Sequence, residues 1–590
     1  MILQALVDCY EALSASEKIA RPGWRPVKTS VALELTETGE ISQAIFLKEE
    51  VEKGKKKVLV PKIFDLPAPV KRTVGVAANF LCDNSSYILG FDDKGKPKRS
   101  LECFAACKAL HEKVLDGVDS PAAKAVSAFF QNWKPEKARE HPVLQDYMDE
   151  LLAGGNLIFR YDGQFVHKDP AIRQAWQEYY DQCGDGPEMV CLVTGKTGPV
   201  ENIHPSVKGV QGAQSSGAAL VSFNAPAFCS YGKEQNLNAP TSKYAAFAYT
   251  SALNYLIASR DYCSRVGDTT VLFWAKNGSP EYSELAMWGI FGGTAPYTEQ
   301  ELRSMIQNLC KGRAVTYEET LLDPNMDFYI LGLSPNAARL SVRFFLHNQF
   351  GSILQNVQAH YDRLEIVKPP FEKFENLPLW RLFYATVRSQ SEYDPFLYKD
   401  AKPYLEKNLA PNLAGETLRA ILNNTRYPAT LLNGVTMRIR AERKITWGRA
   451  AILKAYYLQN PHPDVPKEVL TVSLYPESKN PYYTLGRLFS VLEAVQSAAN
   501  PGINATIKDR YFNSASATPS IVFPTLLNLS EKHRKKLTAG QRIYYEKQIM
   551  ELLAVLGESF PARLSLPQQG TFQLGYYHQT QERYQKKEEN

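Results

Sequence analysis

The sequence predicts an α+β multidomain protein, in which a mixed α/β N-terminal and central region with antiparallel strands is followed by a C-terminal helical bundle. The chain has 590 residues, and single cores stop growing at roughly 250 to 300, so two or three domains are expected. Strand patterns occur mainly before about residue 370, and helical segments separated by Pro and Asn follow. Apolar residues make up 44% of the chain and charged residues 22%, which is typical of globular proteins.

The N-terminal elements are predicted from periodicity. Residues 1–15 carry apolar side chains at helical spacing and are expected to form an amphipathic helix. In residues 31–47, apolar and polar residues alternate on both sides of Thr38-Gly39, which predicts a β-hairpin. Residues 86–115 are expected to form a strand, an Asp-Asp-Lys-Gly turn, a basic arm and a helix. The apolar side of that helix is predicted to contain Leu101, Phe104, Leu110 and either Cys107 or Ala105.

The remaining elements follow in order. Residues 120–185 are expected to be mainly helical, and residues 189–238 to contain strands and glycine-rich loops. A helix over 243–266 is expected to lead into an apolar strand at 269–275, and two strands and a helix are expected between 325 and 365. This order predicts an N-terminal α/β region (1–185), a central α/β region with a Gly/Gln/Ser loop (186–370) and a helical C-terminal region (371–590).

Cysteines, charge and apolar runs limit the class of protein. The nine cysteines form no C-x-x-C pair, so reduced, buried thiols are expected in preference to disulfides or zinc. The N-terminus carries Asp8 and Glu11 and lacks the apolar centre of a signal peptide. No segment approaches the ~20 apolar residues that cross a bilayer, so a cytoplasmic protein without membrane contact is expected. The net charge of +6 is too small to indicate nucleic-acid binding by itself.

No catalytic residue, metal site or cofactor is predicted. Gly195-Lys196-Thr197 matches the end of a phosphate-binding loop, but the glycine required five residues earlier is Val190, and no helix former follows. His204 is a candidate base for Ser215 or Ser216, but no acid is identifiable to orient it. A strand-end turn and a structural histidine are therefore the favoured interpretations.

The most unusual stretch runs from His204 to Pro240. Its loop interleaves glycines with neutral hydrogen-bonding side chains, which suits close approach to phosphates, sugars or base acceptors of a duplex. The predicted duplex contacts in this stretch are Lys208, Gly209, Gln211, Gly212, Gln214, Ser215, Ser216 and Lys233. The alternative is an ordinary surface loop between buried strands, and composition alone favours this alternative.

A second candidate segment lies between residues 71 and 99. Basic residues enter and leave it, asparagines can read base edges, and lysines can neutralise phosphates. The predicted duplex contacts are Lys71, Arg72, Asn79, Asn84 and Ser85. The predicted contacts to the nucleic-acid backbone are Lys94, Lys96, Lys98 and Arg99. Asn and Asp side chains that cap turns beside a solvated lysine face are an equal alternative.

Cations are also concentrated in two C-terminal helical segments that have Tyr and Trp nearby. Such surfaces follow single strands through charge and stacking. The predicted backbone contacts here are Arg438, Arg440, Arg443, Lys532, Arg534, Lys535 and Lys536. Solvated helix faces are the alternative.

Four blocks carry a resemblance to a known family. They are NFLCDNSSYILG (79–90), KGVQGAQSSGAALVSFNAPAFCSYGKEQ (208–235), AAFAYTSALNYL (245–256) and YTLGRLFSVLEAVQ (483–496). In order and spacing along nearly the whole chain, they resemble the large subunit of the type I-C CRISPR surveillance complex, Cascade.

The resemblance implies a non-catalytic subunit that holds the 5′ region of the crRNA, recognises the protospacer-adjacent motif in double-stranded DNA and promotes duplex opening and R-loop formation. Its implied partners are the crRNA, the target double-stranded DNA, the Cascade backbone subunits, the crRNA-processing subunit, a small subunit made from the same gene and a recruited helicase-nuclease. The part from about residue 465 is expected to be similar to that small subunit. A nucleotide-dependent enzyme and a purely architectural scaffold are the alternative functions.

Overall fold

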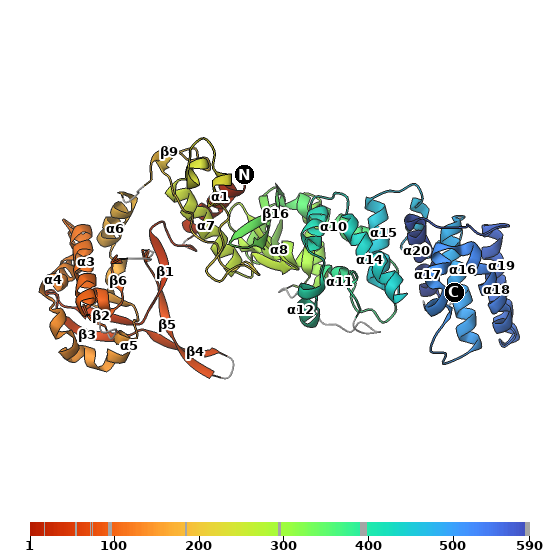
Figure 1. Cartoon of the computed structure of the whole chain (residues 1–590), viewed down its shortest axis with the longest axis horizontal. Coiled ribbons are helices and arrows are strands. Elements are labelled where there is room, and N and C mark those ends of the chain that lie inside the picture. The colour runs from red at the N-terminus through yellow and green to blue at the C-terminus, as the bar shows by residue number, and fades with distance from the viewer. Residues whose placement is uncertain are drawn as a thin grey trace. The chain divides into compact units, whose positions relative to one another are not determined.

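The computed structural model describes residues 1–16, 18–53, 56–70, 72, 75–92, 97–182, 186–292, 297–389 and 398–584. The chain divides into two compact units, the first made of Met1–Pro205 and Val221–Ala252 and the second of Ser206–Leu220 and Leu253–Asn590. Antiparallel sheets occupy the N-terminal and central regions, and the elements described after Gln349 are helices and short 3-10 turns (Figure 1). The predicted α+β class with a helical C-terminal region is therefore confirmed.

The first unit contains a mixed sheet in which β3, β2, β7 and β6 are neighbours and β8 pairs with β7. Its strands are β2 (Val31–Leu35), β3 (Ile41–Phe46), β6 (Cys82–Asp83), β7 (Leu157–Tyr161) and β8 (Gln164–Phe165). The predicted hairpin is confirmed, because β2 and β3 pair antiparallel from Val31 opposite Phe46. The parallel partner of β2 is β7, which lies in a stretch predicted to be mainly helical. Three successive buried residues begin β7, so it lacks the alternation that identifies a half-buried strand.

Two further groups of strands belong to the first unit. An antiparallel sheet has the order β1 (Trp24–Thr29), β5 (Lys56–Pro67) and β4 (Lys48–Lys53). A short hairpin pairs β9 (Glu188–Val190) with β10 (Thr197–Pro199).

The first unit also contains several helices. They are α1 (Ile2–Ala15), α2 (Ser85–Ile88), α3 (Pro97–Leu115), α4 (Pro121–Asn132), α5 (Met148–Leu152) and α6 (Pro170–Gln182), and α7 (Lys243–Ala258) begins in this unit. The N-terminal helix is confirmed. The strand predicted after residue 86 is wrong, because Asn84 caps α2 by accepting from the backbone N of Ser86 at 3.1 Å. On α3, Phe104 and Cys107 are buried as predicted, whereas Leu101 is 43% exposed.

The second unit is built on an antiparallel sheet in the order β11-β12-β15-β16. Its strands are β11 (Cys263–Val266), β12 (Thr269–Ala275), β15 (Asp327–Asn336) and β16 (Arg339–Gln349), and β13 (Val315–Tyr317) pairs separately with β14 (Thr320–Leu322). The predicted strands at 269–275 and between 325 and 349 are confirmed. The helix predicted over 243–266 is too long, because α7 ends at Ala258 and β11 pairs with β12 across a Gly267-Asp268 turn.

Helices pack on this sheet and continue to the C-terminus. They are α8 (Pro280–Phe291), α9 (Glu299–Cys310), α10 (Phe350–Leu364), α11 (Leu379–Tyr384), α12 (Tyr398–Asn408), α13 (Leu413–Leu422), α14 (Ala429–Glu442), α15 (Trp447–Gln459), α16 (Pro481–Ala499), α17 (Ile507–Ala517), α18 (Pro519–Arg534), α19 (Ala539–Leu556) and α20 (Leu566–Glu582). Helices α16 and α20 approach closely at two glycines: a Cβ on Gly486 would lie 1.9 Å from the Phe572 backbone oxygen, and one on Gly575 would lie 2.1 Å from that of Tyr483.

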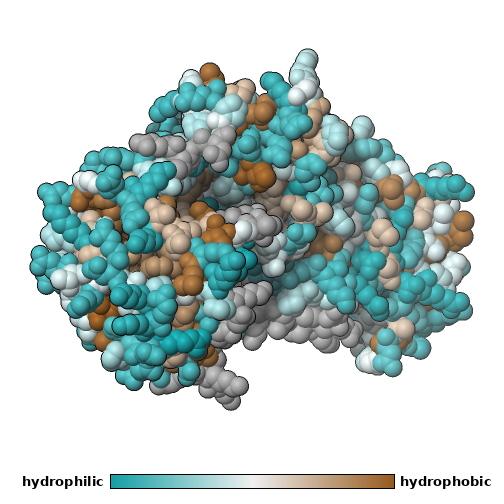
Figure 2. Space-filling view, turned by 60° about the vertical axis from the view of Figure 1, so that its left-hand side comes forward, coloured by the Kyte–Doolittle hydropathy of each residue, from teal (hydrophilic) through white to brown (hydrophobic). Residues whose placement is uncertain are grey.

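The surface and the thiols agree with a folded globular chain. Figure 2 shows one face, on which hydrophilic residues predominate and hydrophobic residues occur in small groups. In the described part of the chain, no helix has both the length and the apolar character needed to cross a membrane. Each described cysteine is a free thiol, and Cys9, Cys82, Cys103, Cys107 and Cys191 are buried; Cys183 lies outside the described residues.

Candidate nucleic-acid interface

The loop Lys208–Gly217 of the second unit is held to its surroundings through its backbone. The Asn254 side chain on α7 accepts from the backbone N of Lys208 at 2.8 Å and donates to the Ser206 oxygen at 3.3 Å. On β11, Arg265 donates from Nη2 to the Gly209 oxygen at 3.2 Å. These bonds use the backbone of the loop, so they position it without occupying its side chains.

Two short bridges hold the base of this loop. Val207 pairs with Ala218 across the loop, and Ala219 pairs with Arg339 at the start of β16. Gly217, with φ of +100°, closes the loop, and a Cβ there would lie 2.7 Å from the Ser206 Cβ. The glycine is therefore required by the loop's own conformation.

The polar side chains of the loop differ in exposure. The side chains of Gln214, Ser215 and Ser216 are exposed and form no hydrogen bond within the described part of the chain, and Lys208 is also exposed. Gln211 is half-buried, and its Oε1 is buried without a hydrogen-bond partner among the described residues. The loop thus presents one cation and several neutral donors and acceptors to solvent. Lys233 is exposed too, but it belongs to the first unit.

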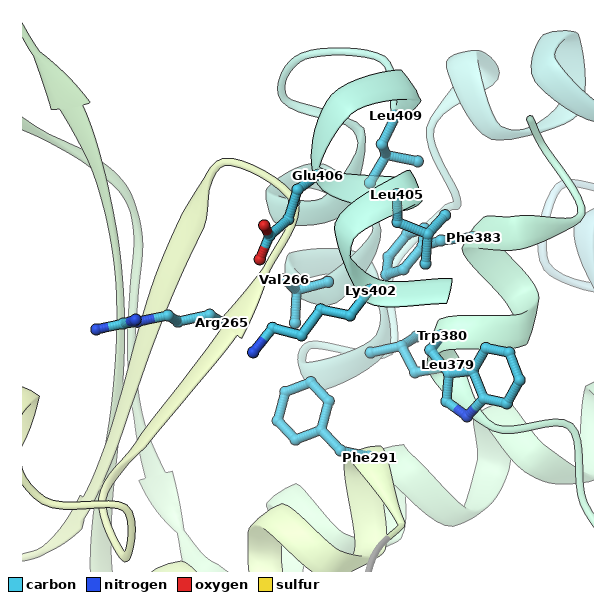
Figure 3. Close-up of a pocket in the computed structure, with 11 residues that line it drawn as sticks. Arg265, Val266, Phe291, Leu379, Trp380, Phe383, Lys402, Leu405, Glu406 and Leu409 are labelled. Carbon is cyan, nitrogen blue, oxygen red and sulfur yellow. The ribbon is translucent and has the colours of Figure 1, made fainter. Parts of the chain in front are cut away.

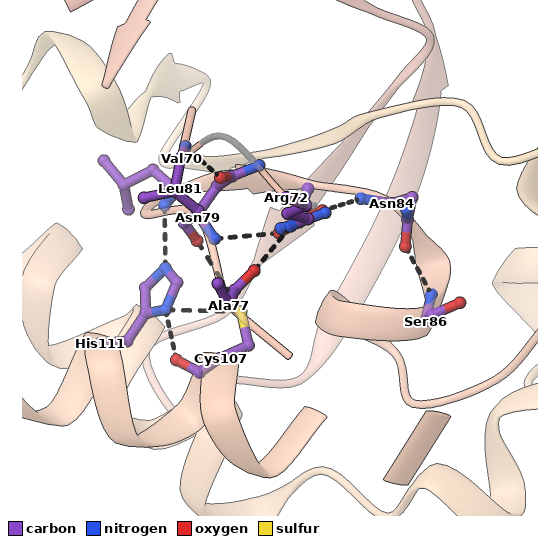
Figure 4. A network of polar contacts seen from close by, with 10 residues as sticks. Val70, Arg72, Ala77, Asn79, Leu81, Asn84, Ser86, Cys107 and His111 are labelled. Atoms are coloured by element: carbon purple, nitrogen blue, oxygen red, sulfur yellow. Dashed lines mark hydrogen bonds and ion pairs between the residues drawn. The ribbon is translucent and has the colours of Figure 1, made fainter. Parts of the chain in front are cut away.

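The Asp83 carboxylate joins Arg72, Asn79 and Asn84 in a polar network of the first unit, and Figure 4 shows these three partners. Arg72 donates to Asp83 Oδ1 from Nη1 at 3.0 Å and forms an ion pair with Oδ2 through Nη2. Its Nε donates to the Ala77 oxygen at 2.6 Å, and its guanidinium lies 3.8 Å from the centre of the Tyr87 ring. The Asp83 side chain is 2% exposed and the Arg72 side chain is 27% exposed, so this ion pair is half-buried. It therefore stabilises the fold of the segment.

The neighbouring predicted contacts are hydrogen-bonded to other residues of the first unit. Asn79 Oδ1 accepts from the Val70 backbone N at 3.0 Å, and Asn84 Oδ1 caps α2. The Ser85 hydroxyl is buried and donates to the Leu151 oxygen at 2.7 Å. These side chains therefore stabilise the fold of the segment, which is the role that the turn-capping alternative describes.

His111 fixes the backbone beside this network. Its Nε2 accepts from the Leu81 backbone N at 2.9 Å, and its Nδ1 lies 2.8 Å from the Cys107 oxygen, to which it donates in the neutral form. Leu81 has a φ of +59°, a conformation that a leucine rarely adopts and that its surroundings must hold. Burial lowers the pKa of His111 to about 4, while the bond to Cys107 raises it.

The basic residues around residue 97 are only partly described. Lys71, Lys94 and Lys96 lie outside the described residues. Lys98 and Arg99 are exposed in the first turn of α3, and Arg99 donates from Nη2 to the Gly75 oxygen at 3.2 Å.

Some of the C-terminal cations form ion pairs or hydrogen bonds, and others are exposed. On α14, Arg438 lies 3.9 Å from Glu442, and Arg440 donates to Gln569 Oε1 at 2.7 Å. Arg443 is exposed at the end of α14.

Near the end of α18, Arg534 is paired with Glu531 and Glu546 and is 13% exposed. Lys536 donates to Asn500 Oδ1 at 3.0 Å. Lys532 and Lys535 are exposed and form no ion pair with the described residues.

The two catalytic motifs considered in the sequence have structural roles. Gly195 and Lys196 form the turn between β9 and β10, and the Lys196 oxygen accepts from the Cys191 backbone N at 2.9 Å. A phosphate-binding loop requires a helix after the motif, whereas Thr197–Pro199 is a strand. His204 is buried, its Nδ1 lies 2.6 Å from the Tyr249 hydroxyl, and burial lowers its pKa to about 4.

The sequence did not identify the residues that position these segments. Asn254 and Arg265 hold the loop, and Asp83 and His111 hold the segment around Asn79. One signal was present for Asn254, because it is a polar residue in the apolar helical run YAAFAYTSALNYLIA. Nothing in the local sequence around Arg265 connects it with Gly209, which lies 56 positions away.

The chain is thus an α+β multidomain protein with an anchored polar loop and exposed cations on its helices. Residues 6–584 match the sequence pattern of the family described as CRISPR-associated protein (Cas_Csd1), and the chain belongs to this CRISPR-associated family. No curated protein matches the chain.

Proposed function

We propose that this chain is the non-catalytic large subunit of a type I-C CRISPR Cascade complex in the cytoplasm. It binds the 5′ region of the crRNA, recognises the protospacer-adjacent motif in double-stranded target DNA, promotes R-loop formation and recruits the helicase-nuclease. Membership of the CRISPR-associated family supports this function, together with the resemblance of the blocks at 79–90 and 208–235 to that subunit.

The observation that carries the proposal is the loop Lys208–Gly217. Its backbone is held by Asn254 and Arg265, while Gln214, Ser215 and Ser216 remain exposed. A preorganised loop loses little conformational entropy on binding, and amide and hydroxyl groups bond base edges, sugars and phosphates. This combination suits recognition of a short duplex motif.

We also propose that the three regions 1–185, 186–370 and 371–590 have different tasks. The first two contact the duplex, and the helical part from about residue 465 acts as a counterpart of the small subunit. Lys532 and Lys535 on this part supply charge for a displaced strand or the guide. The Cascade backbone subunits and the crRNA-processing subunit are the proposed protein partners.

Binding of target DNA by the assembled complex tests this function. Gln214→Ala is expected to weaken binding by about 1 to 3 kcal/mol if the amide contacts a base, and to change the preferred motif. Adding Gln211→Ala should increase the loss. Gln307→Ala is the matched control, because Gln307 is exposed on α9, away from the loop in sequence. Affinity and motif preference that stay unchanged in the double variant would contradict the assignment.

Two assays separate the alternative functions. A purely architectural scaffold predicts that photo-crosslinks from target DNA avoid the region around Gln211, whereas the proposed function predicts that they reach it. A nucleotide-dependent enzyme predicts nucleotide hydrolysis that Lys196→Ala abolishes. The hairpin position of Lys196 does not favour that chemistry.

A further inference from the structure

A pocket in the second unit lies where the β11–β12 turn meets α8, α11 and α12 (Figure 3). Its empty volume is about 460 Å³, including the part open to solvent. The apolar lining consists of Val266, Phe291, Leu379, Trp380, Phe383, Leu405 and Leu409. Three of these side chains are aromatic, so the pocket offers flat apolar surfaces to a ligand.

Three charged side chains lie at one side of this pocket. Arg265 comes from β11, and Lys402 and Glu406 come from successive turns of α12. In Figure 3 the amino group of Lys402 and the carboxylate of Glu406 point toward the strand that carries Arg265, whereas the Arg265 guanidinium extends away from the apolar lining. Within the described part of the chain, neither Lys402 nor Glu406 forms a hydrogen bond or an ion pair. Both groups are therefore available to a ligand.

Arg265 and Lys402 both influence the Cys263 thiol. Burial raises the pKa of the Cys263 thiol, and the positive charges of Arg265 and Lys402 oppose this rise. Both charges therefore act on Cys263, which lies two positions before Arg265 on β11. An anionic group near Cys263 is attracted by both of them.

The chemistry of the pocket selects an amphipathic anion with a flat ring. The ring packs against the aromatic and aliphatic walls, the anion meets Arg265 and Lys402, and the Glu406 carboxylate accepts from an amino group attached to the ring. A nucleotide with an exocyclic amino group combines these three features. Adenine, cytosine and guanine have such a group, and thymine and uracil do not.

The loop proposed to bind nucleic acid adjoins this pocket. The Arg265 side chain that lines the pocket also donates to the Gly209 oxygen of the loop. The loop and the pocket therefore share the Arg265 side chain. A base in a duplex must unstack to enter such a site, and this costs least for a single strand.

We infer that this pocket takes one unstacked nucleotide from a single-stranded segment of the bound nucleic acid, with its base between the apolar walls and its phosphate at Arg265 and Lys402. Glu406 selects bases that carry an amino group. The inference rests on the proposed function and adds a specific subsite to it.

Photo-crosslinking in the assembled complex tests the inference. Target DNA carries 5-iodocytosine at one position at a time, and crosslinked peptides are identified by mass spectrometry. One position is expected to crosslink to the peptide that contains Leu379–Phe383. Lys402→Met should lower this yield about three- to tenfold by removing a phosphate contact, since the methionine keeps most of the apolar stem.

The matched control is Lys407→Met on the same helix. Lys407 is exposed and does not line the pocket, so the same change of charge should leave the yield unaltered. Glu406→Gln should reduce the preference for cytosine over thymine at the crosslinking position. Circular dichroism and DNA affinity of each variant establish that it is folded and assembled.

The outcomes of this experiment distinguish a failure of the nucleotide subsite from a failure of the proposed function. If the complex binds target DNA but no position crosslinks to the pocket, or if Lys402→Met and Lys407→Met have equal effects, the subsite is overturned and the proposed function stands. If a protein partner crosslinks there instead, the pocket is a protein-docking site and the nucleotide assignment is overturned. If the complex does not bind target DNA, the proposed function fails, and the subsite fails with it.

Discussion

Arg265 on β11 donates a hydrogen bond from Nη2 to the backbone oxygen of Gly209 at 3.2 Å. The same side chain lines the pocket between β11, α8, α11 and α12. A substitution of Arg265 therefore changes both the loop and the pocket. Asn254 hydrogen-bonds Lys208 and Ser206 and does not line the pocket, so it is the better residue with which to test the importance of loop anchoring.

Asn254→Ala is expected to loosen the loop Lys208–Gly217 without removing its exposed side chains. The variant loses the acceptor for the Lys208 backbone N and the donor to the Ser206 oxygen. Two lost hydrogen bonds correspond to about 1 to 3 kcal/mol. Hydrogen–deuterium exchange of residues 206–217 should increase, and DNA affinity should fall with unchanged motif preference. Asn308→Ala is the control, because the Asn308 side chain on α9 forms no hydrogen bond with described residues.

Lys532→Gln combined with Lys535→Gln is expected to weaken binding to all DNA sequences equally. Each lost phosphate contact to a single strand removes about 0.7 unit from the slope of log affinity against log salt, so the slope should become shallower by about 1.4 units. Titrations at several salt concentrations measure this change. Lys311→Gln with Lys373→Gln removes the same charge from exposed positions elsewhere in the second unit. A loss restricted to one DNA sequence would contradict phosphate binding.

Asp83→Asn is expected to disorganise the segment around residues 70–90. The carboxylate accepts from Arg72 and from the backbone N of Asn79 and of Asn84. Breaking a buried ion pair costs about 3 to 5 kcal/mol, and the partial exposure of Arg72 favours the lower end of this range. Exchange of the backbone amides of this segment should rise by orders of magnitude. Asp119→Asn, which removes an exposed pair with Lys124, should leave it unchanged.

Acidification is expected to loosen the backbone at Leu81 through His111. The pKa of His111 falls from 6.5 to about 4 on burial, so the folded state binds fewer protons than the unfolded state between these values. The stabilisation is complete above about pH 6.5 and is lost as the pH falls toward 4, up to about 3 kcal/mol. Protonation places a hydrogen on Nε2, which then faces the Leu81 N–H instead of accepting from it.

Amide exchange at Leu81 between pH 7 and pH 5, corrected for intrinsic rates, measures this effect. His111→Gln should remove the dependence on pH. His347→Gln should retain it, because His347 is exposed. Protection at Leu81 that is equal at both pH values in the unsubstituted protein would rule out the proposed role of His111.

The sequence by itself determined the elements that have a local pattern. The helix α1, the β2–β3 hairpin around Thr38-Gly39 and the helical C-terminal region were predicted because amphipathic periodicity and turn residues are contained within each segment. The parallel strand β7 was missed, since its buried residues do not alternate and its partner β2 lies more than 100 positions earlier.

Only the tertiary structure decided how the polar residues are used. Asn84, Ser85, Gln214 and Ser215 look equally available in the sequence, yet Ser85 bonds Leu151, 66 positions away, while Ser215 remains exposed. A polar side chain either satisfies a buried partner or faces solvent, and the partner is supplied by a distant segment that folding brings alongside. For the same reason, the pocket formed by β11, α8, α11 and α12 has no signature in any one of these segments.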